Sequence, residues 1–151
     1  MKGKYIFVLV GCLFATSLWS INEVDKKGRK QGEWIKKYDN GVVMYKGEFK
    51  DGMPIGEFRR FYETGTLHSV QNHKDNNLSD IVIYEQDGKT ISTKGSYIGK
   101  VKDGRWTYYI EGKISLEEQF ENGKLNGFSK VYTKKGELIE EIPYVQGKID
   151  G

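Results

Sequence analysis

A short glycine phrase recurs along the chain at nearly regular intervals, and this repeat limits the fold more than any other feature. The phrase has the form Gly-x-x-x-Gly, and its first glycines are Gly28, Gly52, Gly123 and Gly147. The steps from 28 to 52 and from 123 to 147 are both 24 residues, and the gap from 52 to 123 is one residue short of three such steps. Weaker copies, NNLSD at 76–80 and GKVKDG at 99–104, fill this gap. The chain therefore contains about five units with a period of about 24 residues.

Two further landmarks keep the same step in each unit. A second glycine lies in segments such as YDNGVV and YETGTL, at Gly41, Gly65, Gly88, Gly112 and Gly136. A ring-bearing residue follows eight or nine positions later, at Phe49, His73, Tyr97, Phe120 and Tyr144. Three landmarks in step are much stronger evidence for a structural repeat than a glycine pair alone.

Each unit has the composition of a β-hairpin. Its two arms are rich in Tyr, Trp, Phe, Val and Ile, which favour strands. The Asn, Asp and Gly between the arms tolerate the positive φ of tight hairpin turns. Helices are disfavoured because each recurring glycine costs about 1 kcal/mol in a helix interior. We therefore predict an all-β repeat protein over residues 31–151, a meandering antiparallel sheet of about five β-hairpins.

The Gly-x-x-x-Gly phrase is expected to be the turn between hairpins, with glycine at both ends because the chain reverses sharply there. A lone hairpin is marginal in water, so the hairpins are expected to pair edge to edge and share one apolar face. The aromatic residues that open the units are expected to anchor this face, and they are Trp34, Phe58, Trp106 and Phe128. The third unit lacks an opening aromatic residue.

Residues 1–20 have the pattern of a secretory signal peptide. Two lysines precede an apolar stretch from Tyr5 to about Trp19, which is too short to cross a bilayer comfortably and ends in small residues. We predict cleavage near Ser20, with Ser17 as an alternative, and export to the periplasm, the cell envelope or the medium. Residues 21–30 then form an initial segment before the repeats. A retained N-terminal membrane anchor is the alternative interpretation.

Cys12 is the only cysteine of the chain and lies within this N-terminal segment. The exported part would then have no thiol for a disulfide, a metal or a nucleophilic reaction. A second interpretation is lipid modification of Cys12, because LVGC at 9–12 resembles the pattern before a bacterial lipoprotein cysteine. The signal peptide is the preferred interpretation because apolar residues continue beyond Cys12.

The charge balance argues against nucleic-acid binding. Removing Lys2 and Lys4 from the 24 basic residues leaves 22 against 21 acidic ones, a net charge of +1 for residues 21–151. Lysine and glutamate are interspersed, without the basic stripe that nucleic-acid binders carry. The basic segment DKKGRKQG at 25–32 is short, and we interpret it as a loop leading into the repeats.

The sequence contains no recognisable catalytic or cofactor motif. His68 and His73 are five residues apart, so a single strand would point them to opposite faces and away from a shared metal. Adjacent carboxylates, such as Glu117 and Glu118, would be separated in the same way. No phosphate-binding loop, dinucleotide pattern or zinc spacing occurs. We therefore expect no enzyme activity, no cofactor and no metal.

Units such as GEWIKKYDNGVVMYKGEF resemble MORN repeats. They resemble more closely the bacterial MORN-repeat variant proteins, which are often labelled YwqK-type antitoxins of toxin–antitoxin systems. The resemblance covers about residues 28–151 and implies a meandering sheet of hairpins used for protein or membrane contacts. The label implies an antitoxin-like partner inside the cell, whereas the signal peptide implies export.

The function expected from these features is that of an exported bacterial scaffold that binds a protein or an envelope component. The alternatives are antitoxin-like partner binding and glycan binding in the cell envelope. Membrane contact would come only through the N-terminal segment or lipidation, and the last strand offers an edge for self-association. The tyrosines expected to form the contact surface are Tyr45, Tyr62, Tyr108, Tyr109 and Tyr132.

Overall fold

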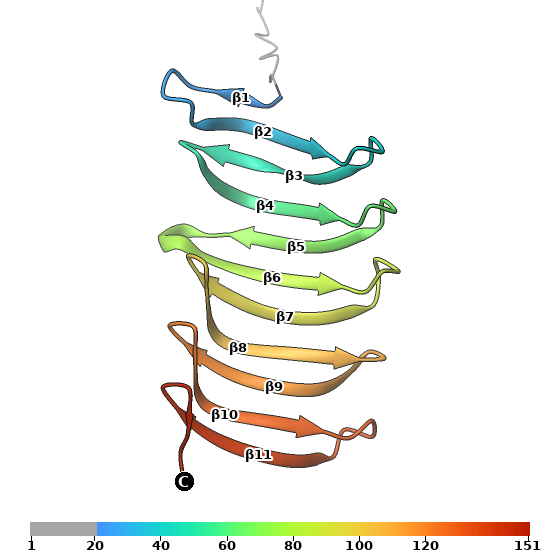
Figure 1. Ribbon diagram of the computed structural model, residues 1–151, viewed down its shortest axis with the longest axis vertical. Coiled ribbons are helices and arrows are strands. Elements are labelled where there is room, and N and C mark those ends of the chain that lie inside the picture. Colours follow the sequence, from blue (N-terminus) through green and yellow to red (C-terminus); the bar gives the residue numbers. More distant parts are fainter. Residues whose placement is uncertain (1–20) are drawn as a thin grey trace, which may run out of the picture.

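The computed structural model describes residues 21–151, which form one open antiparallel sheet with its strands in chain order (Figure 1). The strands are β1 (Glu23–Val24), β2 (Lys30–Lys37), β3 (Val43–Lys50), β4 (Met53–Phe61), β5 (Leu67–His73), β6 (Leu78–Tyr84), β7 (Ile91–Ile98), β8 (Val101–Ile110), β9 (Lys113–Glu121), β10 (Lys124–Tyr132), β11 (Leu138–Val145) and β12 (Lys148–Ile149). One short 3-10 turn, η1 (Asp75–Asn77), lies between β5 and β6. The predicted signal peptide, its cleavage near Ser20 and the lipidation of Cys12 fall outside the described residues.

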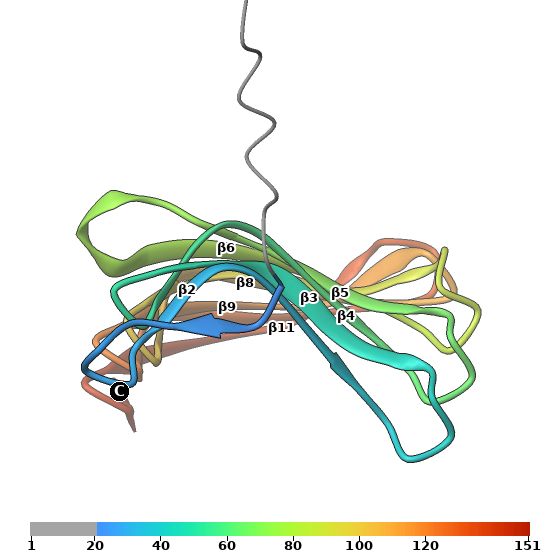
Figure 2. The same ribbon diagram turned by 90° about the horizontal axis from the view of Figure 1, so that it is seen from above.

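The predicted meander of five hairpins is confirmed. The hairpins are β2–β3, β4–β5, β6–β7, β8–β9 and β10–β11, and each pairs with the next one along the chain. Seen from above, the strands arch and successive hairpins rotate relative to one another (Figure 2), as the right-handed twist of strands requires.

The first glycine of the phrase lies in a turn, as predicted: Gly52 and Gly123 lie between successive hairpins, and Gly28 and Gly147 lie between the short end strands and the first and last hairpins. In the turn between β3 and β4, Asp51 and Gly52 both have positive φ, 53° and 81°, which is the backbone geometry that suits a two-residue hairpin turn. The Gly52 amide also donates to the carbonyl of Lys30 at 2.9 Å, so the turn is tied to the preceding unit. Gly99, Gly123 and Gly147 make the same contact with Asn77, Lys102 and Leu125.

The prediction that both glycines of the phrase lie in the turn is wrong for the second glycine. Gly56 lies within β4 with a φ of 62°, at a β-bulge. Across this bulge, Lys46 pairs with Arg59 and Glu48 pairs with Ile55. β4 therefore advances by four residues over a length in which β3 advances by two. The second glycine therefore allows the strand to bulge and bend, because positive φ is strained for residues with a Cβ.

The bulge brings an aromatic ring over a glycine of the neighbouring strand. A Cβ built on Gly47 would lie 2.1 Å from the Phe58 ring, and one built on Gly95 would lie 2.3 Å from the Trp106 ring. Phe58 and Trp106 are only 5% and 2% exposed and are the buried hydrophobic residues of the described chain. The core of this one-layer sheet therefore consists of these two rings, each packed against the backbone of a glycine in the neighbouring strand.

The expected anchoring role is confirmed for Phe58 and Trp106, but it is wrong for Phe128. Phe128 is 49% exposed and lies on the opposite face, because Ser129 occupies the position equivalent to Phe58 and is 9% exposed. In the third unit, β5 and β6 pair without a register shift, from Ser69 opposite Ile83 to His73 opposite Ser79. The unit that lacks the opening aromatic residue therefore also lacks the bulge.

A Gly47→Ala substitution is expected to destabilise the protein by on the order of 3 kcal/mol, because its methyl group overlaps the Phe58 ring. Urea unfolding followed by tryptophan fluorescence measures the change. The control is Glu48→Ala, the next residue, whose side chain lies on the other face and whose loss should cost less than about 0.5 kcal/mol. In a double-mutant cycle, Phe58→Ala should relieve the Gly47→Ala penalty. Strictly additive effects would contradict the ring-on-glycine contact.

Candidate functional site

Side chains alternate between the two faces of the sheet, and one face collects most of the rings. The aromatic face carries Trp34, Tyr45, Phe49, Phe58, His73, Tyr97, Trp106, Tyr108, Phe120 and Tyr144. The other face, called here the charged face, carries residues such as Glu33, Lys46, Glu57, Arg59, Arg105, Glu117 and Lys130. The aromatic face is therefore the natural place to look for a binding surface.

Phe58 is the centre of a first ring cluster on the aromatic face. Its ring centroid lies 5.2 Å from Phe49, 5.7 Å from Tyr45 and 5.7 Å from His73, and the contacts with Phe49 and His73 are edge-to-face. Such pairs contribute about 0.5–1.5 kcal/mol each beyond their buried area. His73 therefore occupies a packing position, like the other ring-bearing residues at its place in the repeat.

A lysine covers the outer side of this cluster. The ammonium of Lys30 lies 4.3 Å from the Trp34 ring centroid and 4.7 Å from that of Phe49, and it donates to the Tyr45 hydroxyl at 3.1 Å. Trp34 is half-buried, and its indole N–H donates to the carbonyls of Glu23 and Gln31. The cluster thus presents a cation held over aromatic faces.

A second cluster repeats this arrangement around Trp106. The Trp106 ring lies 5.0 Å from Tyr97 and 6.4 Å from Phe120. The ammonium of Lys102 lies 4.3 Å from the Trp106 centroid and 4.7 Å from that of Phe120. Lys30 and Lys102 stand three periods of the repeat apart, so the two lysines occupy the same position of their units.

Tyr108 connects the second lysine to a carboxylate. Lys102 donates to the Tyr108 hydroxyl at 2.7 Å, and that hydroxyl donates to Glu118 at 2.9 Å. Burial, together with the hydrogen bond to Glu118, raises the pKa of Tyr108 well above its ordinary value. The hydroxyl is therefore held as a neutral donor, which suits packing and orientation rather than proton abstraction.

The five tyrosines predicted as one contact surface do not share a face. Tyr45 and Tyr108 lie on the aromatic face. Tyr62 lies at the edge formed by the hairpin turns, where its hydroxyl donates to the carbonyl of Tyr84 at 2.8 Å. Tyr132 lies on the charged face and donates to Glu117 at 2.7 Å. Tyr109 also lies on the charged face, with its ring 5.8 Å from the ammonium of Lys94.

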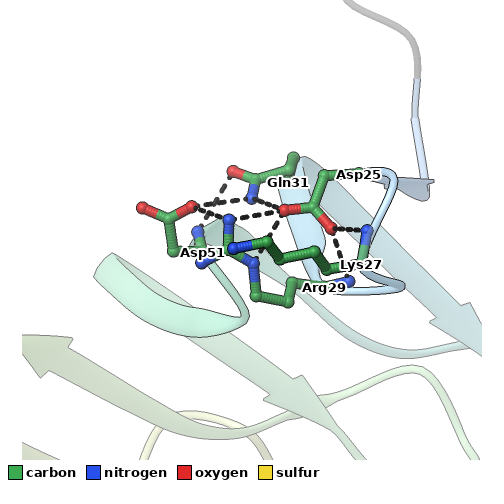
Figure 3. A network of polar contacts seen from close by, with 5 residues as sticks. All are labelled: Asp25, Lys27, Arg29, Gln31 and Asp51. Atoms are coloured by element: carbon green, nitrogen blue, oxygen red, sulfur yellow. Dashed lines mark hydrogen bonds and ion pairs between the residues drawn. The ribbon is translucent and has the colours of Figure 1, made fainter.

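Arg29, in the basic segment before the repeats, is held between two carboxylates (Figure 3). Arg29 pairs with Asp25 at 2.7 Å and with Asp51 at 2.8 Å. Gln31 joins the same two carboxylates, and the Asp51 amide donates to its side chain. Hydrogen bonds from the Arg29 amide and side chain and from the Lys27 amide lower the pKa of Asp25 to about 2. This network fixes the loop against the first hairpin, which agrees with its interpretation as a leading loop.

The two histidines do not form a metal site together. His68 packs against the Tyr62 ring at 4.7 Å, whereas His73 packs against Phe58. Burial lowers the pKa of both imidazoles, and the positive charge of Arg60 lowers it further. Among residues 21–151, no group of three or more His, Cys, Asp or Glu side chains is arranged to hold a metal ion. Within the same residues, no helix is long and apolar enough to span a membrane.

The sequence profile of the MORN repeat variant matches residues 30–51 and 54–75. Each match covers one hairpin, β2–β3 and then β4–β5, and the second match begins one period of the repeat after the first. The first two hairpins are therefore MORN repeats of the variant type. Comparisons with curated proteins and with solved structures gave no match. The three hairpins beyond the matched region continue the same sheet.

The stability of this MORN-repeat protein is expected to fall between pH 7.5 and pH 5.5. Because the folded protein holds the pKa of His68 and His73 below the ordinary value, the unfolded chain binds more protons in this range. The stabilisation is therefore complete above about pH 6.5, the ordinary histidine pKa, and is lost as the pH falls. Urea unfolding at the two pH values measures the difference.

The matched variant is His73→Phe, because Phe49 and Phe120 occupy the same position of their units. This variant should keep the fold and show a smaller loss of stability on acidification. The carboxylates with lowered pKa, such as Asp25 and Asp87, titrate below this window and do not interfere. An unchanged pH dependence would contradict a contribution from His73.

Proposed function

We propose that this MORN-repeat protein is an exported, non-catalytic scaffold whose aromatic face binds another protein or an envelope component. Repeats of this kind form binding scaffolds, and the fold is typically a non-enzymatic binding module. The observation that carries the proposal is the absence of a second layer: within residues 21–151, no other element covers the aromatic face. A partner could therefore lie along several hairpins at once.

The charges of the aromatic face indicate what kind of partner it favours. Its cations are Lys30, Lys36, Arg60 and Lys102, and its carboxylates are Glu118 and Glu140. Glu118 is already engaged by Tyr108. A surface of rings with excess positive charge favours partners that bring apolar groups and negative charges together.

The proposal of a non-catalytic role is supported by the tasks that the reactive side chains already have. His68 and His73 pack against rings, and the Tyr108 hydroxyl is held between Lys102 and Glu118. The packing of both imidazoles against rings, and the raised pKa that keeps the Tyr108 hydroxyl protonated, do not favour these groups as general bases.

Photo-crosslinking from two adjacent positions tests which face meets the partner. Lys36 lies on the aromatic face and Lys37 on the charged face, and both side chains are exposed. With p-benzoylphenylalanine at either position in the native cell, we expect crosslinked products from position 36 and few from position 37. Mass spectrometry of the product then distinguishes a protein from a glycan. Crosslinking from position 37 alone, or from neither position, would contradict the proposal.

Cell fractionation tests the export part of the proposal. The mature protein is expected outside the cytoplasm, with an N-terminus near Ile21 that intact-mass spectrometry can read. A mature mass that includes a lipid on Cys12 would instead support the lipoprotein interpretation. A cytoplasmic protein with residues 1–20 intact would contradict export and favour the antitoxin-like alternative.

A further inference from the structure

The turn between β5 and β6 interrupts the row of turns on one edge of the sheet. The turns before and after it are tied to the preceding unit by the amides of Gly52 and Gly99. Here η1 takes the place of the two-residue turn, and Asn76 and Asn77 both adopt positive φ, 60° and 59°. In Figure 2 this turn stands apart from the others on that edge. The irregular third unit therefore leaves a gap in the row of turns along this edge of the sheet.

A hollow of about 560 Å³ occupies this gap. Its lining combines apolar Met53, Pro54 and Leu78 with charged Arg60 and Lys100 and half-buried His73. The volume falls within the range of about 300–1,000 Å³ that is typical of sites for small ligands. Because β4, β5, η1 and the turn after β7 all contribute, the hollow depends on the break in the repeat.

The two main cations of the hollow have no anionic partner of their own. Within residues 21–151, neither Arg60 nor Lys100 forms an ion pair, whereas the neighbouring Arg59 pairs with Glu57 at 2.6 Å on the charged face. Lys74, also in the lining, is already paired with Asp80. Asp75 is the carboxylate of the lining, so the side chains that line the hollow carry a net positive charge.

We propose that this hollow binds a carboxylate group joined to a short apolar chain. The planar guanidinium of Arg60 can hold both oxygens of a carboxylate, and Lys100 adds a second positive charge. The apolar chain would lie against Met53, Pro54 and Leu78, which are otherwise half-exposed or exposed. Such a group occurs both in free organic acids and at the C-terminus of a peptide that ends in an aliphatic residue.

This site shares Arg60 and His73 with the contact surface proposed above, but it needs only the irregular third unit and its neighbours. A small ligand can be tested without knowing the partner of the aromatic face. Failure of the hollow to bind an acid leaves the scaffold proposal intact, and failure of crosslinking at position 36 leaves the hollow untouched.

Titration of the ¹⁵N-labelled full-length chain with hexanoate tests the site. We expect saturable shifts of the backbone amides of Asn76, Asn77 and Gly99, which surround the hollow. Acetate, which lacks most of the apolar chain, should bind at least about tenfold more weakly. The neutral methyl ester should not saturate, because it has no charge to pair with Arg60. Absence of saturable shifts with hexanoate, or equal binding of the ester, would overturn the proposal.

Two adjacent arginines provide the matched variants. Arg60→Gln should weaken hexanoate binding about tenfold through loss of a charge-assisted bidentate contact, whereas Arg59→Gln on the charged face should not change it. Lys100→Gln, in an exposed turn, should weaken binding without affecting the fold. Equal affinities of the parent and both hollow variants would overturn the proposal.

A second arm of the titration distinguishes the source of the carboxylate. A short peptide that ends in leucine is compared as the free acid and as the C-terminal amide. Tighter binding of the peptide acid than of hexanoate supports a protein terminus as the natural ligand, whereas weaker binding supports a free organic acid. Equal binding of the peptide acid and its amide would contradict recognition of the terminal carboxylate.

Discussion

The fold depends on one contact, an aromatic ring laid over a glycine of the neighbouring strand. A one-layer sheet has no opposing layer to bury its side chains, so its apolar groups must cover one another on the sheet surface. Phe58 on Gly47 and Trp106 on Gly95 solve this problem at the bulges between hairpins, where the glycine of the next phrase bends the incoming strand. The surrounding rings and the two lysines are arranged around these centres. The same contact also explains why the glycines within β3 and β7 are needed although neither has a positive φ.

The sequence predicted the meander because turns and strands are local features. The recurring glycines, with Asn and Asp between the arms of each unit, indicated the tight turns, and the 24-residue step placed them. The bulges were missed, although the pattern contained them: Gly47 precedes Phe58 at the same spacing at which Gly95 precedes Trp106. Phe128 was assigned to the wrong face because it follows Gly127 by one residue, whereas Phe58 follows Gly56 by two. An offset of one residue turns a strand side chain to the other face, so Ser129 lies where a ring was expected.

The candidate site was predicted less well, because residue type alone does not assign a face. Tyr108 and Tyr109 are neighbours on one strand, so the alternation of side chains already separates them. The lysine-covered clusters were not predicted, yet Lys30 and Lys102 each stand four residues before a tryptophan. Their contact with rings on the adjoining strands depends on the bulge and on long flexible side chains, and neither is visible in composition or periodicity. The neutralisation of Arg29 by two aspartates, one of them in the next turn, required the three-dimensional register.

The irregular third unit shows how a repeat can create a local site. Its first strand pairs regularly with β5, so the ring, the bulge and the tight turn are lost together. Gln71 stands where the neighbouring units have Gly47 or Gly95. Replacement of this glycine does not by itself remove the bulge, because Gln119 is the unpaired residue at the bulge between β9 and β10, as Gly47 is at the bulge between β3 and β4. In the third unit, the regular pairing is accompanied by a longer turn, and η1 stands apart from the row of turns (Figure 2). The space beside this turn collects side chains from two successive hairpins and the turns that follow them, with Arg60 left without a carboxylate partner among residues 21–151. A uniform array of repeats offers an extended surface, and a single departure from uniformity adds a hollow with its own charge and shape.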